Sequence, residues 1–359
     1  MSGRVADIRC TVVSAPLHTP FVTALRRTTT ADGVLVEVID EDGVVGVGEA
    51  PQVWAVTGDS LAGARACVEG PLASLVRGRD PADLHDLTDA VRAAVVGNHT
   101  AKAAVDVALH DLLARRLGVP LPVLLGGSTL RVRTDVTVSA GDEDSLVAAA
   151  RSRRDEGFAT LKLKVGTDAG ADLRHVLAVR RAVGPGVAIR LDANQGWSAR
   201  DAVRVIGSLE DAGDDLELVE QPVRAHDLTG LAWVTDRVGT PVMADESVFS
   251  VRDLSAVIER RAADLVNVKL AKAGGLGPAR TLLELARAHD MGTVVGSMME
   301  TSVGVGAAAS LAAALGTTAV ADLDAAWWAV APPVTGGLRY AGDVLVLPDE
   351  PGLGIAVPA

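Results

Sequence analysis

Hydrophobic and polar positions follow two different rhythms along the chain. In residues 1–125 the alternating runs VADIRCTVVSAPL and GVLVEVIDEDGVVGVGEA are accompanied by helical stretches such as NHTAKAAVDVALHDLLARRLG. Alternation predicts β-strands, and the second run predicts a hairpin that turns at Glu41–Gly43. In the helical stretch we expect Thr100 as the N-cap and Gly118 as the stop. The first part of the chain is therefore predicted to be an α+β domain.

The rhythm changes after PLPVLLGG, where short β-rich runs begin to alternate with helical runs rich in alanine, leucine and arginine. The predicted strands lie near residues 132–138, 159–165, 187–192, 216–220, 241–245, 264–269, 293–297 and 317–322. Alternation of this kind predicts an α/β fold with a parallel sheet, and eight units predict a closed (β/α)8-type barrel. The first and eighth units are the weakest, and a doubly wound open sheet is the alternative.

Composition narrows the possible partners and the compartment. A formal net charge of −12 disfavours nucleic acid and anionic membranes as partners. Cys10 and Cys67 show no metal-ligand spacing and predict no disulfide framework, which fits a cytoplasmic protein. The start, MSGRVADIRC, lacks the apolar core of a signal peptide. The longest apolar run, at 303–315, is too short to cross a bilayer and is predicted to be a buried helix.

Five consecutive predicted strands end in charged residues. In TLKLKVG the alternation of side chains puts two lysines on the face opposite the leucines. The charged residues, in chain order, are Lys162 and Lys164, Asp192, Glu220, Asp245 and Lys269. They recur at roughly the spacing of one βα unit, so we expect all of them at the C-terminal mouth of the barrel, where barrel enzymes hold their catalytic groups.

Three of these charges are carboxylates on adjacent strands: Asp192, Glu220 and Asp245. Any one of them alone could cap a helix or pair with an arginine. Neighbouring strands lie about 5 Å apart, so the three converge, and without a cation they would repel one another. An all-oxygen ligand set favours a hard ion, and we predict Mg²⁺.

The lysines are expected on two sides of that ion. Strands two and six are opposite in a closed eight-stranded barrel, so Lys164 and Lys269 would face each other across the mouth. Two bases on opposite faces of a carbon next to a carboxylate can exchange its proton with inversion, through a metal-stabilised enediolate. Lys162 is expected to assist electrostatically and, together with the metal, to lower the pKa of the lysine base.

The pattern KxK, DxN, E, DE and K at these strand ends resembles the enolase superfamily, in its muconate-lactonizing subgroup. The resemblance covers nearly the whole chain. It implies a capping domain at 1–125, a modified TIM barrel at 126–324 and a C-terminal segment at 325–359 that returns to the cap, in a homo-oligomer. It also implies Lys164 and Lys269 as the acid/base pair, with Asn194 and Glu246 beside the metal ligands.

The substrate is suggested by VADLDAAWW at the end of the eighth strand. Asp322 and Asp324 share a face there, across the mouth from the metal, and a negative pair suits a substrate ammonium. The motif resembles the DxD of dipeptide epimerases, which grips the α-ammonium of the dipeptide. A succinylated substrate would be repelled by the same pair. The alternative is that one aspartate caps a helix or pairs with an arginine.

Two further stretches bear on substrate choice. Arg26, in TPFVTALRR, matches the cap-loop arginine of Ala-Glu epimerases, which implies contact with an acidic second side chain. The alternative is a surface arginine beside Arg27. Met298, in GSMMETS of the seventh-strand loop, is expected to shape the pocket together with Met299.

The sequence thus predicts an isomerase: a Mg²⁺-dependent dipeptide epimerase, with an L-Ala-D/L-Glu preference as the finer expectation. An N-succinylamino acid racemase, an o-succinylbenzoate synthase or a muconate cycloisomerase of the same superfamily remains open. A barrel that binds a metal-carboxylate ligand without catalysis is the non-enzyme alternative. A histidine-based mechanism is disfavoured because Lys269 and Ser297 end the strands where a histidine would be needed.

Overall fold

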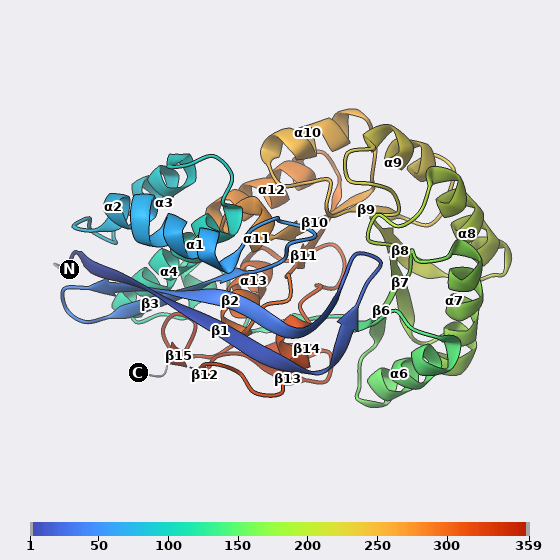
Figure 1. The fold of residues 1–359 in the computed structure, drawn as a ribbon, viewed down its shortest axis with the longest axis horizontal. Coiled ribbons are helices and arrows are strands. Elements are labelled where there is room, and N and C mark those ends of the chain that lie inside the picture. The colour runs from blue at the N-terminus through green and yellow to red at the C-terminus, as the bar shows by residue number, and fades with distance from the viewer. Residues whose placement is uncertain (1–2, 357–359) are drawn as a thin grey trace.

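The computed structural model describes residues 3–356 and begins with an antiparallel sheet of order β1-β2-β3, drawn in blue in Figure 1. Its strands are β1 (Val5–Val22), β2 (Arg27–Asp40) and β3 (Val45–Pro51). The predicted hairpin turn is confirmed: Gly43 has φ +80°, and Asp40 Oδ1 accepts hydrogen bonds from the amides of Asp42 and Val44. Helical elements follow: α1 (Leu61–Cys67), η1 (Val68–Leu72), α2 (Ala73–Val76), α3 (Leu84–Ala93), α4 (His99–Leu117) and α5 (Leu121–Leu124).

Helix α4 packs directly on the sheet because two glycines of β3 leave room for its backbone. A Cβ on Gly46 would lie 2.1 Å from the Ala108 carbonyl oxygen, and one on Gly48 would lie 1.9 Å from that of Ala104. The helix stops at Gly118, as predicted, in the left-handed conformation. The predicted N-cap is wrong: Asn98 holds that position, and Thr100 lies inside the helix.

The second part of the chain forms a seven-stranded parallel sheet of order β11-β10-β9-β8-β7-β6-β5. Its strands are β5 (Val136–Val138), β6 (Thr160–Lys164), β7 (Ala188–Asp192), β8 (Leu216–Glu220), β9 (Val242–Ala244), β10 (Leu265–Lys269) and β11 (Gly292–Gly296). The intervening helices cover its outer side (Figure 1). They are α6 (Glu143–Asp155), α7 (Ala169–Val183), α8 (Ala199–Asp211), α9 (Leu228–Thr235), α10 (Val251–Glu259), α11 (Leu270–Ala273), α12 (Leu276–Ala288) and α13 (Ser302–Leu315).

The sheet closes through single bridges rather than through an eighth ladder. Ala321 bridges to Thr134 beside β5, and Asp322 bridges to Gly296 at the end of β11. The eighth predicted strand is thus reduced to these two residues and is followed by the short η2 (Ala325–Trp328). The first predicted strand also splits, because β4 (Arg131–Arg133) pairs outside the barrel. The predicted modified barrel behind an α+β domain is confirmed, and the doubly wound sheet is wrong.

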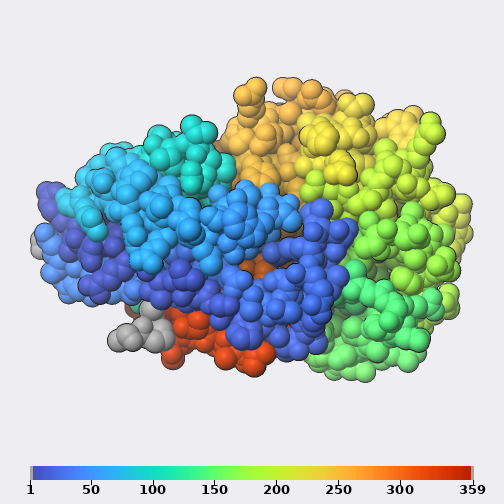
Figure 2. Space-filling view, in the orientation of Figure 1, coloured from blue at the N-terminus to red at the C-terminus, as the bar shows by residue number. Residues whose placement is uncertain are grey.

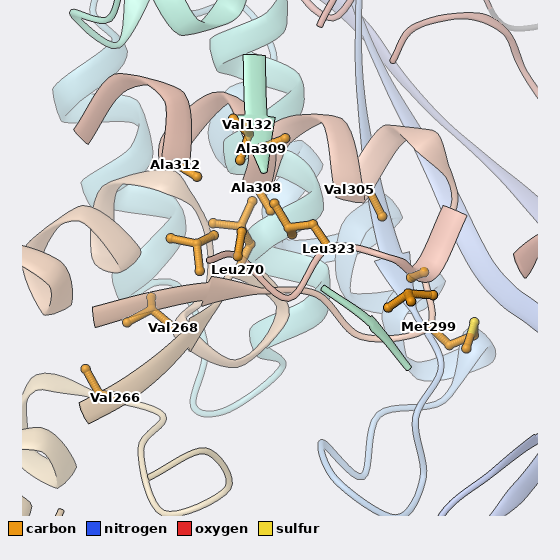
Figure 3. Close-up of a cluster of buried hydrophobic side chains, with 14 of the residues drawn as sticks. Val132, Val266, Val268, Leu270, Met299, Val305, Ala308, Ala309, Ala312 and Leu323 are labelled. Atoms are coloured by element: carbon orange, nitrogen blue, oxygen red, sulfur yellow. The ribbon is translucent and has the colours of Figure 1, made fainter. Parts of the chain in front are cut away.

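Helix α13 is the predicted buried helix, and its small side chains allow it to lie close to the barrel. Figure 3 shows Ala308 and Ala309 of this helix in one hydrophobic cluster with Val268 of β10 and with Leu323. Among residues 3–356, no helix combines the length and the apolarity needed to cross a membrane.

The C-terminal segment runs beside both parts of the chain. Its strands are β12 (Thr335–Gly336), β13 (Arg339–Ala341), β14 (Val344–Val346) and β15 (Ile355–Ala356), and β14 pairs with β4. Farther along, Asp111 of α4 accepts hydrogen bonds from the amides of Leu353 and Val47 and from Arg115. This buried carboxylate therefore joins β3, α4 and the C-terminal segment. The boundaries at residues 125 and 324 stay predictions.

Replacing Asp111 with alanine should weaken that junction, because buried amides and Arg115 lose their acceptor. We expect the free energy of unfolding in urea to fall by about 3 kcal/mol. The control is Asp236→Ala, which removes an exposed ion pair with Arg237 and should leave the urea midpoint unchanged. Equal losses in the two variants would contradict the assignment.

Candidate active site

A pocket opens where the N-terminal part of the chain crosses the C-terminal mouth of the barrel. Figure 2 shows a narrow opening in the blue N-terminal part, through which later barrel segments are visible in orange. Ten of the twelve sequence-predicted site residues line the pocket: Lys162, Lys164, Asn194, Asp245, Glu246, Lys269, Met298, Asp322, Asp324 and Arg26. The other two, Asp192 and Glu220, are fully buried at the ends of β7 and β8.

The predicted lysines and carboxylates occupy corresponding strand ends. Lys164, Asp192, Glu220 and Lys269 are the last residues of β6, β7, β8 and β10, and Asp245 directly follows β9. In the sheet β6 and β10 are four strands apart, with the carboxylate-bearing strands between them. Lys164 and Lys269 therefore reach the same pocket from two sides, as expected.

Each lysine that lines the pocket contacts a carboxylate. Lys164 Nζ lies 2.5 Å from Asp192 Oδ2, and Lys269 Nζ lies 2.7 Å from Asp245 Oδ2. Burial lowers the pKa of Lys269, but Asp245 and then Asp322 outweigh it, so that pKa is raised. The pKa of Lys162 is likewise raised, since Asp322 and Glu220 outweigh burial. Lys162 lowers the pKa of Lys269, which is the expected direction, but the carboxylates raise it by more, and the expected lowering with the metal bound stays a prediction.

Several side-chain oxygens at these strand ends have no hydrogen-bond partner within residues 3–356. Burial, followed by repulsion from Asp192, raises the pKa of Glu220 to about 8, and its Oε2 is buried without a hydrogen bond. Glu246 Oε2 and Asn194 Oδ1 are also buried and unsatisfied. Within residues 3–356, no three His, Cys, Asp or Glu side chains already form a metal cluster. The mutual repulsion and the orphaned oxygens nevertheless fit a hard divalent ion.

Asn194 and Glu246 link the ends of β7 and β9, the two strands on either side of β8. The Asn194 amide donates to Asp192 Oδ1 at 2.9 Å, and its Nδ2 donates to Glu246 Oε1 at 3.3 Å. Burial, followed by repulsion from Asp245 and Asp192, raises the pKa of Glu246 to about 7. These contacts orient the two acidic strand ends toward one another.

Asp322 and Asp324 differ in how far their charge is compensated. Asp322 contacts Lys162, accepts from Asn267 Nδ2 at 3.0 Å and lies 3.8 Å from Lys269 Nζ. Asp324 has no cationic partner within the described part of the chain. Neither aspartate pairs with an arginine of residues 3–356, and Asp324 precedes η2 without a capping hydrogen bond. Within the described residues, neither aspartate therefore serves as a side-chain helix cap or as the partner of an arginine.

Arg26 lies in the loop between β1 and β2 and lines the pocket, whereas Arg27 is exposed. The Arg26 guanidinium forms no ion pair with any carboxylate of residues 3–356, and burial lowers the pKa of Arg26. Met298 packs against Val53 of the N-terminal part and is only 7% exposed. Both residues thus lie where a ligand in the pocket would meet them.

Asn267 and Lys272 are among the polar residues of the site that the sequence analysis missed. Asn267 donates to Glu220 Oε1 at 2.8 Å, and Lys272 Nζ lies 2.5 Å from Asp245 Oδ1. Asn267 precedes Lys269 by two positions on β10, so strand alternation could have placed it on the same face. Lys272 follows the strand in α11, where no periodic signal points to the mouth.

Comparison with known proteins identifies the family. The mandelate racemase / muconate lactonizing enzyme N-terminal domain matches residues 6–126, and the enolase C-terminal domain-like family matches residues 145–359. The chain belongs to this family of the enolase superfamily, as the pattern of charged strand ends indicated.

Named relatives share the whole architecture. The L-Ala-D/L-Glu epimerase of Bacillus subtilis (strain 168) is 41% identical over 98% of this chain and 96% of that protein. A substrate-liganded complex of the Bacillus subtilis epimerase has a TM-score of 0.97 and covers 99% of both chains. A dipeptide epimerase from Enterococcus faecalis V583, complexed with Mg and the dipeptide L-Leu-L-Tyr, has a TM-score of 0.93 at 36% identity, with 98% and 99% coverage. An N-succinyl-L-Arg/Lys racemase of Bacillus cereus (strain ATCC 14579) is 30% identical over 99% of this chain and 95% of that protein.

The carboxylate cluster predicts that Mg²⁺ stabilises the folded protein. At 100 times its dissociation constant, a ligand that binds only the folded state contributes about 2.7 kcal/mol. We expect Mg²⁺ to raise the melting temperature of the wild type but not of Glu220→Gln, as measured by differential scanning calorimetry. Glu284→Gln, which changes an exposed helix pair, is the control and should respond like the wild type. If Mg²⁺ raised the melting temperature of Glu220→Gln as much as that of the wild type, Glu220 would not be a ligand of the ion.

Proposed function

We propose that this chain is a Mg²⁺-dependent dipeptide epimerase with a preference for substrates of the L-Ala-D/L-Glu type. The observation that carries the proposal is the placement of Lys164 and Lys269 on two sides of one pocket that also contains an uncompensated aspartate, Asp324. Two opposed bases have no use in a barrel that merely binds a ligand. The similarity to named epimerases over nearly the full chain supports the same reaction.

The residues of the mouth divide the chemistry among them. Lys164 and Lys269 act on the α-carbon of the second residue: a neutral lysine takes its proton, and the protonated lysine on the other side returns one to the opposite face. Asp192, Glu220 and Asp245 would hold the metal. A bound Mg²⁺ supplies a Lewis acid that offsets negative charge on the substrate carboxylate. The same ion would offset the carboxylate charges that raise the pKa of Lys269.

The far wall of the pocket accounts for the choice of a dipeptide. Asp324, with Asp322 two residues before it, provides negative charge for the α-ammonium of the first residue. Arg26, half-buried and without a carboxylate partner among residues 3–356, suits the acidic side chain of the second residue. Met298 and Val53 supply apolar contacts around the bound dipeptide. Together these groups recognise both ends of a small, zwitterionic substrate.

The alternatives fit the pocket less well. A substrate of an N-succinylamino acid racemase or an o-succinylbenzoate synthase brings a carboxylate where Asp324 already leaves excess negative charge. A muconate cycloisomerase substrate also has no ammonium to meet that charge. The similarity to an N-succinyl-L-Arg/Lys racemase makes the succinylated class the competitor to measure.

We further propose the cellular compartment, the oligomeric state and the domain boundaries of the enzyme. Cys10 and Cys67 are both free, which suits a reducing cytoplasm. The net charge of −12 argues against nucleic acid or membrane partners, and we propose a homo-oligomer. We also propose residues 1–125 as the capping domain, 126–324 as the barrel and 325–359 as the returning segment.

Incubation with L-Ala-L-Glu and Mg²⁺ in D₂O should replace the glutamyl α-proton by deuterium and produce the second diastereomer, both followed by proton NMR. Lys269→Ala should lose epimerisation while keeping the rise in melting temperature with Mg²⁺. Lys102→Met, which changes a buried lysine outside the pocket, is the control and should remain active. If no dipeptide of a broad library exchanged its α-proton, dipeptide epimerisation would be ruled out. If Lys269→Ala were fully active, only the two-base mechanism would be ruled out.

Arg26→Gln tests the preference for an acidic second residue. Loss of a hydrogen-bonded charge pair should raise the KM for L-Ala-L-Glu by about tenfold and leave that for L-Ala-L-Leu nearly unchanged. Arg27→Gln, at the exposed neighbouring position, is the matched control for steady-state kinetics with both dipeptides. An equal effect on the two substrates would rule out a role for Arg26 in side-chain recognition.

A further inference from the structure

The two oxygens of Asp324 have different surroundings. Oδ2 accepts hydrogen bonds from the amide of Thr137, at 2.7 Å, and from the indole Nε1 of Trp328, at 3.0 Å. Oδ1 has no hydrogen-bond partner within residues 3–356, and the residue lines the pocket while being only 5% exposed. The carboxylate is therefore fixed through one oxygen and available to a ligand through the other.

Asp322, two residues earlier, is in the opposite situation. One of its oxygens contacts Lys162, and the other accepts from Asn267 and lies 3.8 Å from Lys269. Its charge is thus compensated by the protein, whereas no lysine, arginine or histidine of residues 3–356 pairs with Asp324. A buried carboxylate without a cation is costly, so Asp324 is the member of the pair that requires a cationic ligand.

Trp328 is held firmly enough to fix the direction of its N–H. The residue is 2% exposed, and its ring stacks on that of His18 with ring centres 5.1 Å apart and an interplanar angle of 12°. Phe21 and Trp327 meet it edge-on at 5.3 Å and 5.4 Å. His18 and Phe21 belong to β1, and Phe21 itself lines the pocket. The indole therefore connects the orientation of Asp324 to the N-terminal strand above the mouth.

We propose that Trp328 is a positioning residue for substrate recognition. Its indole N–H holds Oδ2 of Asp324, which turns Oδ1 toward the α-ammonium of the dipeptide. The inference rests on the proposed function and deepens it, because it separates the roles of the two aspartates. Asp324 meets the substrate, and Asp322 serves the lysines. A side chain held by two donors loses little rotational freedom when the ammonium arrives.

The test compares two adjacent tryptophans of the same cluster. Trp328→Phe keeps an aromatic ring but removes the N–H, whereas Trp327→Phe is the matched control, since the indole of Trp327 donates no hydrogen bond within the described residues. We expect Trp328→Phe to raise the KM for L-Ala-L-Glu by about tenfold, the size of one hydrogen bond to a charged group, with kcat within about twofold. Trp327→Phe should leave KM unchanged.

A substrate without the ammonium isolates the effect from general loosening of the pocket. The preference for L-Ala-L-Glu over N-acetyl-L-Ala-L-Glu should fall about tenfold in Trp328→Phe and not in Trp327→Phe. In the Asp324→Asn background, Trp328→Phe should change KM by less than about twofold, because a residue that acts through Asp324 has nothing left to position. Equal KM shifts in the two phenylalanine variants, or full additivity with Asp324→Asn, would overturn the proposal.

The proposal remains testable if Trp328→Phe does not fold. In wild-type protein labelled with ¹⁵N-tryptophan, L-Ala-L-Glu should shift the indole resonance of Trp328, and N-acetyl-L-Ala-L-Glu should not. An unmoved resonance at saturating dipeptide would overturn the positioning role. Exchange of the α-proton by the wild type in D₂O is scored separately, so failure of the proposed function is distinguishable from failure of this inference.

Discussion

The parallel register of three neighbouring strands is the constraint on which the site depends. Lys164 of β6 is aligned with Asp192 of β7, and Asp192 with Glu220 of β8, so three buried charges stand side by side at one level of the barrel. Such charges are tolerated only because each has a partner on the next strand or can share a cation. A shift of one residue in any of these strands would turn its charge to the opposite face.

The N-terminal part completes the pocket and is joined to the barrel by buried polar contacts. Glu49, near the end of β3, accepts hydrogen bonds from the amides of Thr301 and Gly304 at the start of α13. This contact fixes the sheet that carries Phe21 and the loop with Arg26 relative to the seventh-strand loop. Lys164 and Lys269 therefore reach the pocket from the barrel, whereas Arg26 reaches it from the N-terminal part.

Sequence reasoning was most successful where a short period determines the outcome. Strand alternation placed Lys162 and Lys164, and the repeat of βα units placed the remaining strand-end charges, because both depend on local geometry. It was least successful for long-range partners. Asp111 meets the amide of Leu353, and Asp324 meets the amide of Thr137, each from far along the chain, where no local period points to the partner. The predicted length of the eighth strand is too great, because only Ala321 and Asp322 of its apolar run form β-bridges.

The single bridges at Ala321 and Asp322 have an evolutionary consequence. The segment proposed to recognise the substrate amine contributes least to the hydrogen-bonded ladder of the barrel, whereas Lys164 and Lys269 end strands that pair with a neighbour on each side. Substitutions in this segment can therefore redirect the choice of substrate at small cost to folding, with the proton-transfer pair inherited intact. We therefore expect related isomerases of the family to differ in sequence mainly in the segment around Ala321 and Asp322.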